Sequence, residues 1–414
     1  MVTYPNGWDE ERLEDVTSSI ITGGTPSTNN PSFWGGTIPW LASTEIHQKR
    51  VNKPTTYITD VGLQNSSAKI VPEKSVLIAL AGQGKTRGTA AFLQQNMAIN
   101  QSLAALVVNG KADAEFLFYV MEASYDSLRE VSSGDGGRGG LNKKLLKKFT
   151  VSIPSDVCEQ KSIAETLSCI DEHIANLTEL IEKKKAIRDG ALEDLVSGRT
   201  RLKGFSGEWE EYSFDVFFTL LPNNTLSREK LSKWGTIGNI HYGDVLIKYH
   251  NNVTDKDGIP RIKADIDTRS FRLLQSGDII VADTAEDETV GKAIQICDVS
   301  IPLVGGLHTI VCRPNYDTAL GYLGYYINSK NYHNQLFPHI TGIKVSSISK
   351  KAIKTTVLNL PKDIDEQKAI VEVLSSMDAE ITSLEEERDK MLQIKAGAMD
   401  DLLTGRIRLT RQGG

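Results

Sequence analysis

The chain repeats one of its own segments. Residues 154–202 begin Pro-Ser-Asp-Val-Cys-Glu-Gln-Lys, residues 361–409 begin Pro-Lys-Asp-Ile-Asp-Glu-Gln-Lys, and both end Gly-Arg-x-Arg-Leu. The two copies align without a gap at a constant offset of 207 residues, from Pro154/Pro361 to Leu202/Leu409. A gapless repeat of this length indicates that one structural unit is used twice. We therefore expect a fold with approximate internal two-fold symmetry.

Both repeated segments are predicted to be long helices. Each opens with an Asp followed three residues later by a Glu (Asp156/Glu159 and Asp363/Glu366), which is typical of a capping box. Each closes at a Gly (Gly198 and Gly405), which suits a helix C-cap. The predicted length is about 41 residues, or ~60 Å at the helical rise of 1.5 Å per residue.

Apolar residues recur in these helices at alternate spacings of three and four. They are Ile163, Leu167, Ile170, Ile174, Leu177 and Ile181 in the first helix, and Ile370, Leu374, Met377, Ile381 and Leu384 in the second. This period of 3.5 predicts a coiled-coil seam. One apolar stripe cannot be buried alone, so we expect the two helices to pack on each other as an antiparallel pair. Gly190 and Gly397 occupy matched positions at a cost of about 1 kcal/mol each, which suggests close approach by a neighbouring backbone.

The remaining halves, the first globule (1–152) and the second globule (203–359), are related more distantly. Ser75-Val-Leu-Ile-Ala aligns with Asp278-Ile-Ile-Val-Ala, and Leu141-Asn-Lys-Lys aligns with Ile348-Ser-Lys-Lys. Short β-branched runs and Gly-rich turns predict mixed α/β globules. The expected fold class is α+β, with two mixed α/β globules joined by two long antiparallel coiled-coil helices in a pseudo-two-fold repeat. The predicted segments are 1–152, 153–202, 203–359 and 360–414.

The distribution of charge matters more than the net charge of −6. The repeated segments 156–202 and 363–409 carry −3 and −6, so the rest of the chain carries +3 and is compatible with a nucleic-acid partner.

There is no run of ~18 apolar residues and no apolar signal region at the N-terminus. We expect a cytoplasmic protein without a membrane partner. Its cysteines have no metal-ligand spacing and are interpreted as reduced thiols without a metal: Cys158, Cys169, Cys297 and Cys312.

The doubled layout resembles one known family, the specificity subunits of Type I restriction–modification enzymes. The resemblance covers essentially the whole chain. It is carried by the helix openings Glu159-Gln160 and Glu366-Gln367 and by the endings Leu195-Val-Ser-Gly-Arg199 and Leu402-Leu-Thr-Gly-Arg406. Further matching stretches lie in the globules: Gly23-Gly-Thr-Pro-Ser27, Gly82-Gln-Gly-Lys-Thr-Arg-Gly88 and Lys344-Val-Ser-Ser-Ile-Ser349.

The resemblance implies a DNA-recognition subunit that does no chemistry itself. Each globule would be a target recognition domain that reads one half of a bipartite double-stranded DNA site. The helix pair would set the gap between the half-sites and dock two methyltransferase subunits, and then two restriction (translocase) subunits where these exist. AdoMet, ATP and Mg²⁺ would belong to those partners, and no cofactor is expected in this chain.

The candidate DNA contacts are loop residues with amide, hydroxyl, carboxylate or basic groups. Lysines at matched positions, such as Lys143 and Lys350, suit phosphates, which carry no sequence information. Residues that differ between the copies, such as Gln83 and Glu286, suit base readout; a merely solvated polar cluster is the alternative. The candidates are Gln83, Lys85, Thr86, Arg87, Arg138, Asn142 and Lys143 in the first globule, and Thr284, Glu286, Lys292, Lys344, Ser346 and Lys350 in the second.

Two other functional classes remain open from the residues alone. Ala79-Leu-Ala-Gly-Gln-Gly-Lys-Thr86 fits a relaxed phosphate-loop pattern, so the chain could be a nucleotide-binding or DNA-modifying enzyme that uses the Gly82–Thr86 loop. Such a loop must open a helix, and no helical period follows it. The chain could also be a scaffold whose globules bind proteins. Asn30-Pro-Ser-Phe33 is interpreted as a turn, and His308, in an apolar run, as a core histidine.

Overall fold

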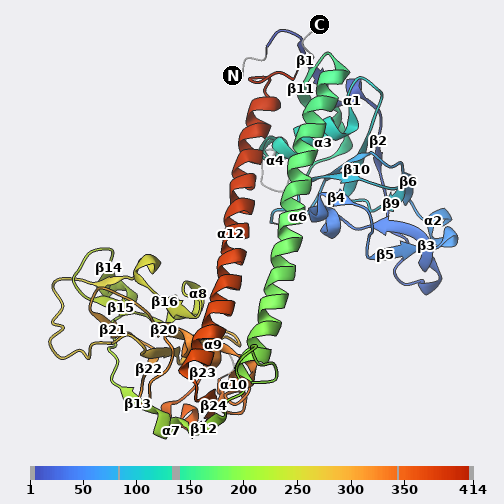
Figure 1. Ribbon diagram of the computed structural model, residues 1–414. Coiled ribbons are helices and arrows are strands. Elements are labelled where there is room, and N and C mark those ends of the chain that lie inside the picture. Colours follow the sequence, from blue (N-terminus) through green and yellow to red (C-terminus); the bar gives the residue numbers. More distant parts are fainter. Residues whose placement is uncertain (1–4, 83, 133–139, 343–344, 410–414) are drawn as a thin grey trace. The chain divides into compact units, whose positions relative to one another are not determined.

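The computed structural model describes residues 5–82, 84–132, 140–342 and 345–409 (Figure 1). The chain divides into two compact units. The first unit is Met1–Thr178 with Glu386–Gly414, and the second unit is Glu179–Glu385. The boundary falls inside both long helices, α6 (Val157–Val196, green in Figure 1) and α12 (Ile364–Leu402, red). Each unit therefore combines one globule with parts of both helices.

The first globule is built on a five-stranded sheet of order β2-β10-β7-β8-β4. A four-stranded sheet of order β5-β3-β9-β6 and the antiparallel pair β1-β11 complete it. The strands are β1 (Trp8–Arg12), β2 (Thr17–Thr22), β3 (Trp34–Leu41), β4 (Arg50–Val51), β5 (Thr56–Ile58), β6 (Lys69–Val71), β7 (Val76–Ala79), β8 (Ala90–Leu93), β9 (Met97–Ile99), β10 (Leu103–Val108) and β11 (Thr150–Pro154). The helices are α1 (Leu13–Val16), η1 (Pro31–Phe33), η2 (Ser43–Gln48), α2 (Asp60–Gln64), α3 (Ala114–Ala123), α4 (Tyr125–Ser132) and α5 (Lys143–Lys148).

The second globule has the same plan, with a five-stranded sheet of order β13-β22-β18-β20-β16. Its other sheets are β14-β17-β15-β21 and the pairs β12-β24 and β19-β23. The strands are β12 (Trp209–Ser213), β13 (Phe218–Leu221), β14 (Leu231–Ser232), β15 (Gly238–Ile240), β16 (Asn252–Val253), β17 (Arg261–Ile262), β18 (Ile279–Ala282), β19 (Thr284–Ala285), β20 (Ala293–Ile296), β21 (Leu303–Gly305), β22 (Thr309–Pro314), β23 (Ser346–Ser347) and β24 (Val357–Pro361). The helices are α7 (Phe214–Phe217), η3 (Arg228–Lys230), α8 (Tyr242–Ile247), η4 (Asp255–Asp257), α9 (Tyr322–Asn328), α10 (Lys330–His333), η5 (Phe337–His339) and α11 (Lys350–Ile353).

The aligned apolar runs form the central strands β7 and β18, as the sequence predicts. Both strands are buried on both faces, and alternate residues enter two different cores because side chains alternate along a strand. In β7, Val76 and Ile78 enter one apolar cluster while Leu77 and Ala79 enter another. In β18, Ile279 and Val281 separate from Ile280 and Ala282 in the same way. The mixed α/β class of both globules is therefore confirmed.

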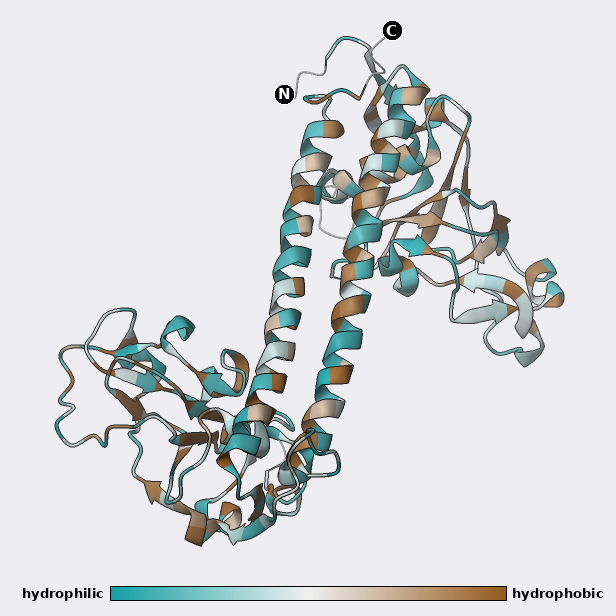
Figure 2. Cartoon of the chain, in the orientation of Figure 1, coloured by the Kyte–Doolittle hydropathy of each residue, from teal (hydrophilic) through white to brown (hydrophobic). Residues whose placement is uncertain are grey.

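The long helices supply part of each core. Ile163 and Leu167 of α6 join Leu402 of α12 in the main cluster of the first unit. Leu192 and Leu195 of α6 join Ile370 and Leu374 of α12 in the second. Figure 2 shows apolar residues recurring among polar ones along both helices, as expected for a seam. Of the remaining predicted seam positions, Leu177, Ile181 and Ile381 are buried.

Ion pairs show that α6 and α12 run antiparallel within each unit. In the first unit, Asp171 of α6 lies 2.7 Å from the Lys395 ammonium of α12, and His173 lies 3.4 Å from Glu387. In the second unit, Lys185 pairs with Glu385 at 2.7 Å and Arg188 lies 3.4 Å from Asp378. Because higher numbers on one helix pair with lower numbers on the other, the antiparallel packing is confirmed in both units.

The predicted capping boxes form only in part. The Asp156 and Asp363 carboxylates accept from the first-turn N–H groups of Cys158 and Asp365, each at 2.9 Å. The expected Glu half of each box is wrong. Glu159 is buried and paired with Arg408 at 2.7 Å, and Glu366 is buried and paired with Arg201 at 2.6 Å. The repeated Glu therefore binds the repeated Arg at the end of the opposite copy.

The helix C-caps are confirmed, whereas the interpretation of the mid-helix glycines is wrong. Gly198 and Gly405 both have φ of +71°, the left-handed conformation that favours glycine. Among the described residues, a Cβ built at Gly190 or Gly397 would meet no neighbouring atom within 4 Å, so the space beside each glycine is open. Within the described ranges, no helix combines the length and apolar character needed to cross a bilayer.

Replacing Gly190 or Gly397 by alanine is expected to raise the free energy of unfolding by about 1 kcal/mol each. The reason is that alanine restricts the unfolded chain and favours the helix, while the folded chain has room for the added methyl group. Urea denaturation of the isolated chain measures the change. Gly198→Ala is the matched control and should destabilise, since its φ is positive and a Cβ there would lie 3.3 Å from the Trp209 ring.

Candidate nucleic-acid interface

In each globule the structure brings together two loops that the sequence places far apart. In the first globule, the loop between β7 and β8 (80–89) meets the segment that enters α5, where the Leu141 N–H donates to the Leu80 carbonyl at 3.1 Å. In the second, the matching bond runs from the Ile348 N–H to the Asp283 carbonyl at 2.9 Å. There the pairing of β19 with β23 also joins Thr284 to Ser347 and Ala285 to Ser346. We name these two places the first and second loop pair.

The loop 80–89 is the connection of a β-hairpin, which contradicts the phosphate-loop alternative. β7 and β8 are antiparallel, with Ile78 opposite Ala90, and the Gly88 N–H donates to the Ala79 carbonyl at 3.0 Å. The loop therefore leads into a strand and opens no helix, so it lacks the helix N-terminus that a phosphate loop uses to bind phosphate. Asn30–Phe33 is a turn, as predicted, because Asn30 caps the short helix η1.

Helix α4 fixes the backbone of the first loop. The Arg129 guanidinium donates to the carbonyls of Gly84 at 2.9 Å and Arg87 at 3.2 Å, and the Tyr125 hydroxyl donates to the Lys85 carbonyl at 2.9 Å. Thr86 Oγ1 lies 3.2 Å from His47 Nε2. These contacts leave the Lys85 side chain exposed and hold Thr86 and Arg87 half-buried. Neither Arg129 nor Tyr125 was among the sequence candidates, because their function here depends on a tertiary contact.

The other candidates of the first globule lie at the start of α5 or outside the described residues. Asn142 is the N-cap of α5, and its side-chain oxygen accepts from the Leu145 N–H at 3.0 Å. Lys143 follows in the first turn and is exposed. Gln83 and Arg138 lie outside the described residues.

The second loop pair borders a pocket of about 430 Å³ lined by α8 and the β18–β20 loop. Thr284, Glu286 and Val345 line it together with Tyr242 and Ile247 of α8. Glu286 is exposed, whereas Thr284 is half-buried and its hydroxyl donates to Asp283 at 2.8 Å. Ser346 is half-buried in β23 and Lys350 is exposed at the start of α11. Lys344 lies outside the described residues.

Two polar residues of the second globule lie in surroundings that the sequence did not predict. The prediction of a core His308 is wrong: its side chain is 48% exposed, its φ is +55°, and its ring lies 3.3 Å from the Asp283 carboxylate. The Lys292 ammonium donates to the carbonyls of Leu246 at 2.9 Å and Tyr249 at 2.8 Å. Burial lowers the pKa of Lys292. With two of its three N–H bonds used to cap α8, Lys292 has at most one left for a phosphate.

The β7–β8 loop and the β18–β20 loop carry opposite net charge. Loop 80–89 contains Lys85 and Arg87 and no acid, whereas the aligned loop 283–292 contains four acids and one base. The acids are Asp283, Glu286, Asp287 and Glu288. Equivalent hairpin loops are therefore basic in one globule and acidic in the other. Two copies that differ in this way would favour different chemical groups on whatever they bind.

The match to a known family decides the classification of the chain. The model of the Type I restriction modification DNA specificity domain matches it twice, at residues 5–186 and 207–393. The chain belongs to this family. Each specificity domain contains one globule and most of the long helix that follows it, so the sequence repeat corresponds to two copies of one domain.

Individual relatives agree with this assignment. The specificity subunit of a Type I restriction enzyme of Escherichia coli is 25% identical over 174 residues, which are 41% of this chain and 43% of that relative. The chain therefore spans less than half of that relative's length. The specificity subunit of another such enzyme, from Methanocaldococcus jannaschii, is 22% identical over 98% of this chain and 94% of its own length. The crystal structure of the S subunit from M. genitalium has the same fold, with a TM-score of 0.59, 16% identity and coverage of 95% of this chain and 96% of that one.

Proposed function

We propose that the chain is the DNA-specificity subunit of a Type I restriction–modification complex and recognises a bipartite duplex site, one half with each loop pair. The observation that carries this is the duplicated loop pair. The same two loops meet at the same hydrogen bond in both globules, while their side chains differ. Different side chains on one scaffold suit two half-sites of different sequence, because base edges carry the sequence information.

The proposed function is recognition without catalysis. The residues of the loop pairs would contact DNA, and partner subunits would methylate and, where present, cleave it. In this proposal two methyltransferase subunits, and two restriction subunits where the system has them, supply the chemistry. AdoMet, ATP and Mg²⁺ are bound by those subunits. Membership of a family whose relatives are named specificity subunits supports this assignment.

Methylome sequencing tests the proposal directly. A host that expresses the chain together with its methyltransferase subunit should show adenine methylation at one bipartite sequence, and a host that lacks the chain should not. The purified complex should also bind DNA carrying that sequence with an affinity that falls as salt rises, because phosphate contacts release counterions. Methylation without a bipartite motif, or DNA binding that salt leaves unchanged, would instead favour a protein-binding scaffold.

Lengthening both long helices is expected to lengthen the gap between the half-sites. Four residues added to α6 and four to α12 add about 6 Å of helix, which corresponds to roughly two base pairs at ~3.4 Å each. Methylome sequencing should then report the same two half-site sequences with a longer spacer. Inserting the same four residues into α6 alone is the control, since mismatched helices should abolish methylation. An unchanged spacer would contradict the proposal that the helices set the gap.

A further inference from the structure

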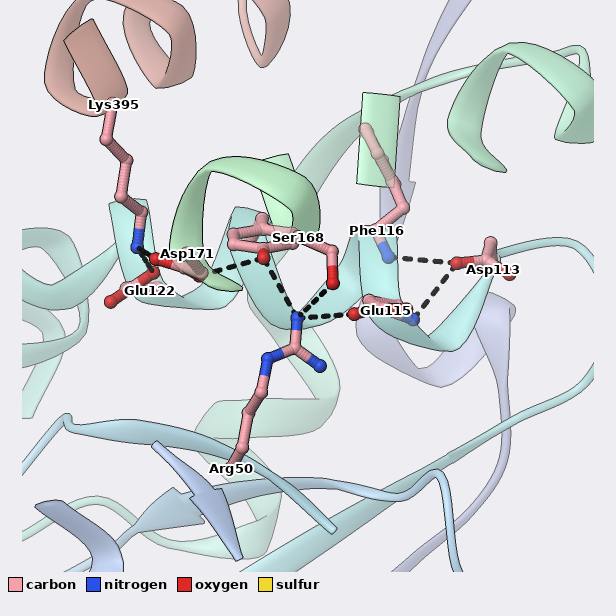
Figure 3. A network of polar contacts seen from close by, with 9 residues as sticks. Arg50, Asp113, Glu115, Phe116, Glu122, Ser168, Asp171 and Lys395 are labelled. Carbon is pink, nitrogen blue, oxygen red and sulfur yellow. Dashed lines mark hydrogen bonds and ion pairs between the residues drawn. The ribbon is translucent and has the colours of Figure 1, made fainter. Parts of the chain in front are cut away.

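One carboxylate in the first unit joins three elements. Asp171 of α6 accepts from the Tyr119 hydroxyl of α3 at 2.8 Å, and its other oxygen lies 2.7 Å from the Lys395 ammonium of α12. Figure 3 shows Asp171 and Lys395 pointing toward each other. The globule, the helix that leaves it and the opposite helix thus meet at Asp171. We call Tyr119, Asp171 and Lys395 the first triad.

Tyr119 and Lys395 of the first triad are buried, Asp171 is 23% exposed, and the charges around them are balanced. The Lys395 side chain is 9% exposed, and its ammonium also lies 3.2 Å from Glu122 and 5.5 Å from the centre of the Tyr119 ring. Burial raises the pKa of Tyr119, so its hydroxyl keeps the proton that it donates to Asp171. Arg50 completes the cluster by donating to the Tyr119 hydroxyl at 2.9 Å. It also donates to Ser168 Oγ of α6 at 3.1 Å (Figure 3). Three cations thus meet three carboxylates: Lys49, Arg50 and Lys395 with Glu115, Glu122 and Asp171.

The second unit contains the same triad at the matched positions. The Tyr325 hydroxyl of α9 donates to Asp378 of α12 at 2.7 Å, and Arg188 of α6 lies 3.4 Å from the other oxygen of Asp378. The offset of 207 residues that relates the helices also relates Asp171 to Asp378 and Arg188 to Lys395. We call Tyr325, Asp378 and Arg188 the second triad.

Two charged neighbours of the first triad have no charged counterpart in the second unit. Glu122 corresponds to Asn328, whose amide donates to Asn251 at 2.9 Å and to the Ala293 carbonyl at 2.7 Å. Arg50 at the start of β4 corresponds to Asn252 at the start of β16. The tyrosine, aspartate and cation therefore persist while their surroundings change. This indicates that both globules need the same contact with the long helices, whereas the side chains of their loop pairs differ.

We propose that the triads are positioning residues that fix the angle of each globule on the helix pair and so restrict the DNA spacer to one length. The inference rests on the proposed function. Apolar contacts between a globule and the helices are non-directional and allow small rotations. A hydrogen bond and a partly buried ion pair that share one carboxylate are directional, so they select one orientation.

The test asks whether a substitution changes the spacer length of the methylated sites, the sequence of the half-sites, or both. The chain with Asp171→Asn is expressed with its methyltransferase subunit, and the methylome is compared with that of the wild type. The two half-site sequences should stay the same. Methylation of sites whose spacer is one base pair longer or shorter should rise about tenfold, the change expected when a buried hydrogen bond and its ion pair are weakened. Tyr119→Phe, which removes only the hydroxyl, should act in the same direction with a smaller effect.

Comparison of the two triads shows which substitution at Lys395 should be tolerated. Lys395→Arg introduces the cation that the second triad already uses, so this variant should keep the wild-type spacer. His173→Gln is the matched control, because it removes an exposed pair with Glu387 between the same two helices and should leave spacer fidelity unchanged.

Three outcomes would overturn the proposal. One is an unchanged spacer in both Asp171→Asn and Tyr119→Phe, and another is relaxed half-site sequence in place of relaxed spacing. The third is an equal loss of methylation at every spacer together with a lower melting temperature, which would show a purely structural role. A wild-type chain that directs no bipartite methylation would instead overturn the proposed function, and this is seen before any substitution is made.

Discussion

Arg408→Ala is expected to lower the free energy of unfolding by about 3 kcal/mol, because it leaves a buried carboxylate without its partner. The Glu159 side chain is fully buried and receives two bonds from the Arg408 guanidinium, one of them at 2.7 Å. Removing one member of a buried ion pair costs about 3–5 kcal/mol. We take the lower end because the Arg408 side chain is 29% exposed, so water can partly replace it. Arg408 also donates to the Asn6 carbonyl at 2.8 Å, which the substitution removes as well.

Thermal unfolding followed by calorimetry measures this loss. A cost of this size corresponds to a drop in Tm of roughly 6–12 °C for a unit of about 200 residues. Arg201→Ala should have a similar effect in the second unit, since Glu366 is just as buried. Arg406→Ala is the control. Arg406 lies two residues before Arg408, and its substitution removes only exposed ion pairs with Asp400 and Asp401. Exposed ion pairs contribute little to stability, because water screens the two charges. Equal effects of Arg406→Ala and Arg408→Ala would contradict the prediction.

Glu286→Gln is expected to weaken discrimination at one base pair of the second half-site by roughly 5- to 150-fold. Glu286 is exposed on an acidic loop. A carboxylate repels phosphates but accepts from the amino group of cytosine in the major groove, so its presence at a DNA surface suits base readout. Loss of one negative charge should also strengthen binding to unrelated DNA. Competition binding by the chain with its methyltransferase, using single-base-pair variants of the second half-site, measures both effects.

Lys350→Ala provides the contrast for this prediction. An exposed lysine at the start of α11 suits a phosphate contact, so its loss should weaken binding to every sequence alike and reduce the slope of affinity against salt by about one. The half-site sequence should not change. Lys143→Ala should behave in the same way for the first half-site. If Glu286→Gln weakened binding to all sequences equally, a role in base readout would be excluded.

The features that depend on residues close together in the sequence, or on the internal repeat, could be predicted from the sequence. The period of 3.5 predicted the helix seam, and the terminal glycines predicted C-caps that the structure places at φ +71°. The aligned runs Val76–Ala79 and Ile279–Ala282 predicted equivalent central strands. Each of these follows from local conformational preference or from comparing the chain with itself.

The sequence indicated which loops carry the candidate contacts but not how the fold holds those loops. Comparison of the two copies identified the β7–β8 and β18–β20 loops as the variable positions. It could not show that α4 fixes the first loop through Arg129, or that Lys292 caps α8. It also placed His308 in a core, although a turn with positive φ exposes that side chain.

The sequence by itself determined the doubled architecture, because repetition and periodicity are properties of the chain's order. Its motifs also carried the resemblance to the family, which the match to the specificity-domain model confirmed. Only the tertiary structure decided the partners of the repeated polar residues. Glu159 has the spacing of a capping box, yet its carboxylate binds Arg408, which lies 249 residues away. Asp171 likewise reads as one acid on a solvated helix, yet it joins Tyr119 to Lys395. A charged group is stabilised by whichever opposite charge folding brings within a few ångströms, and sequence spacing does not report that distance.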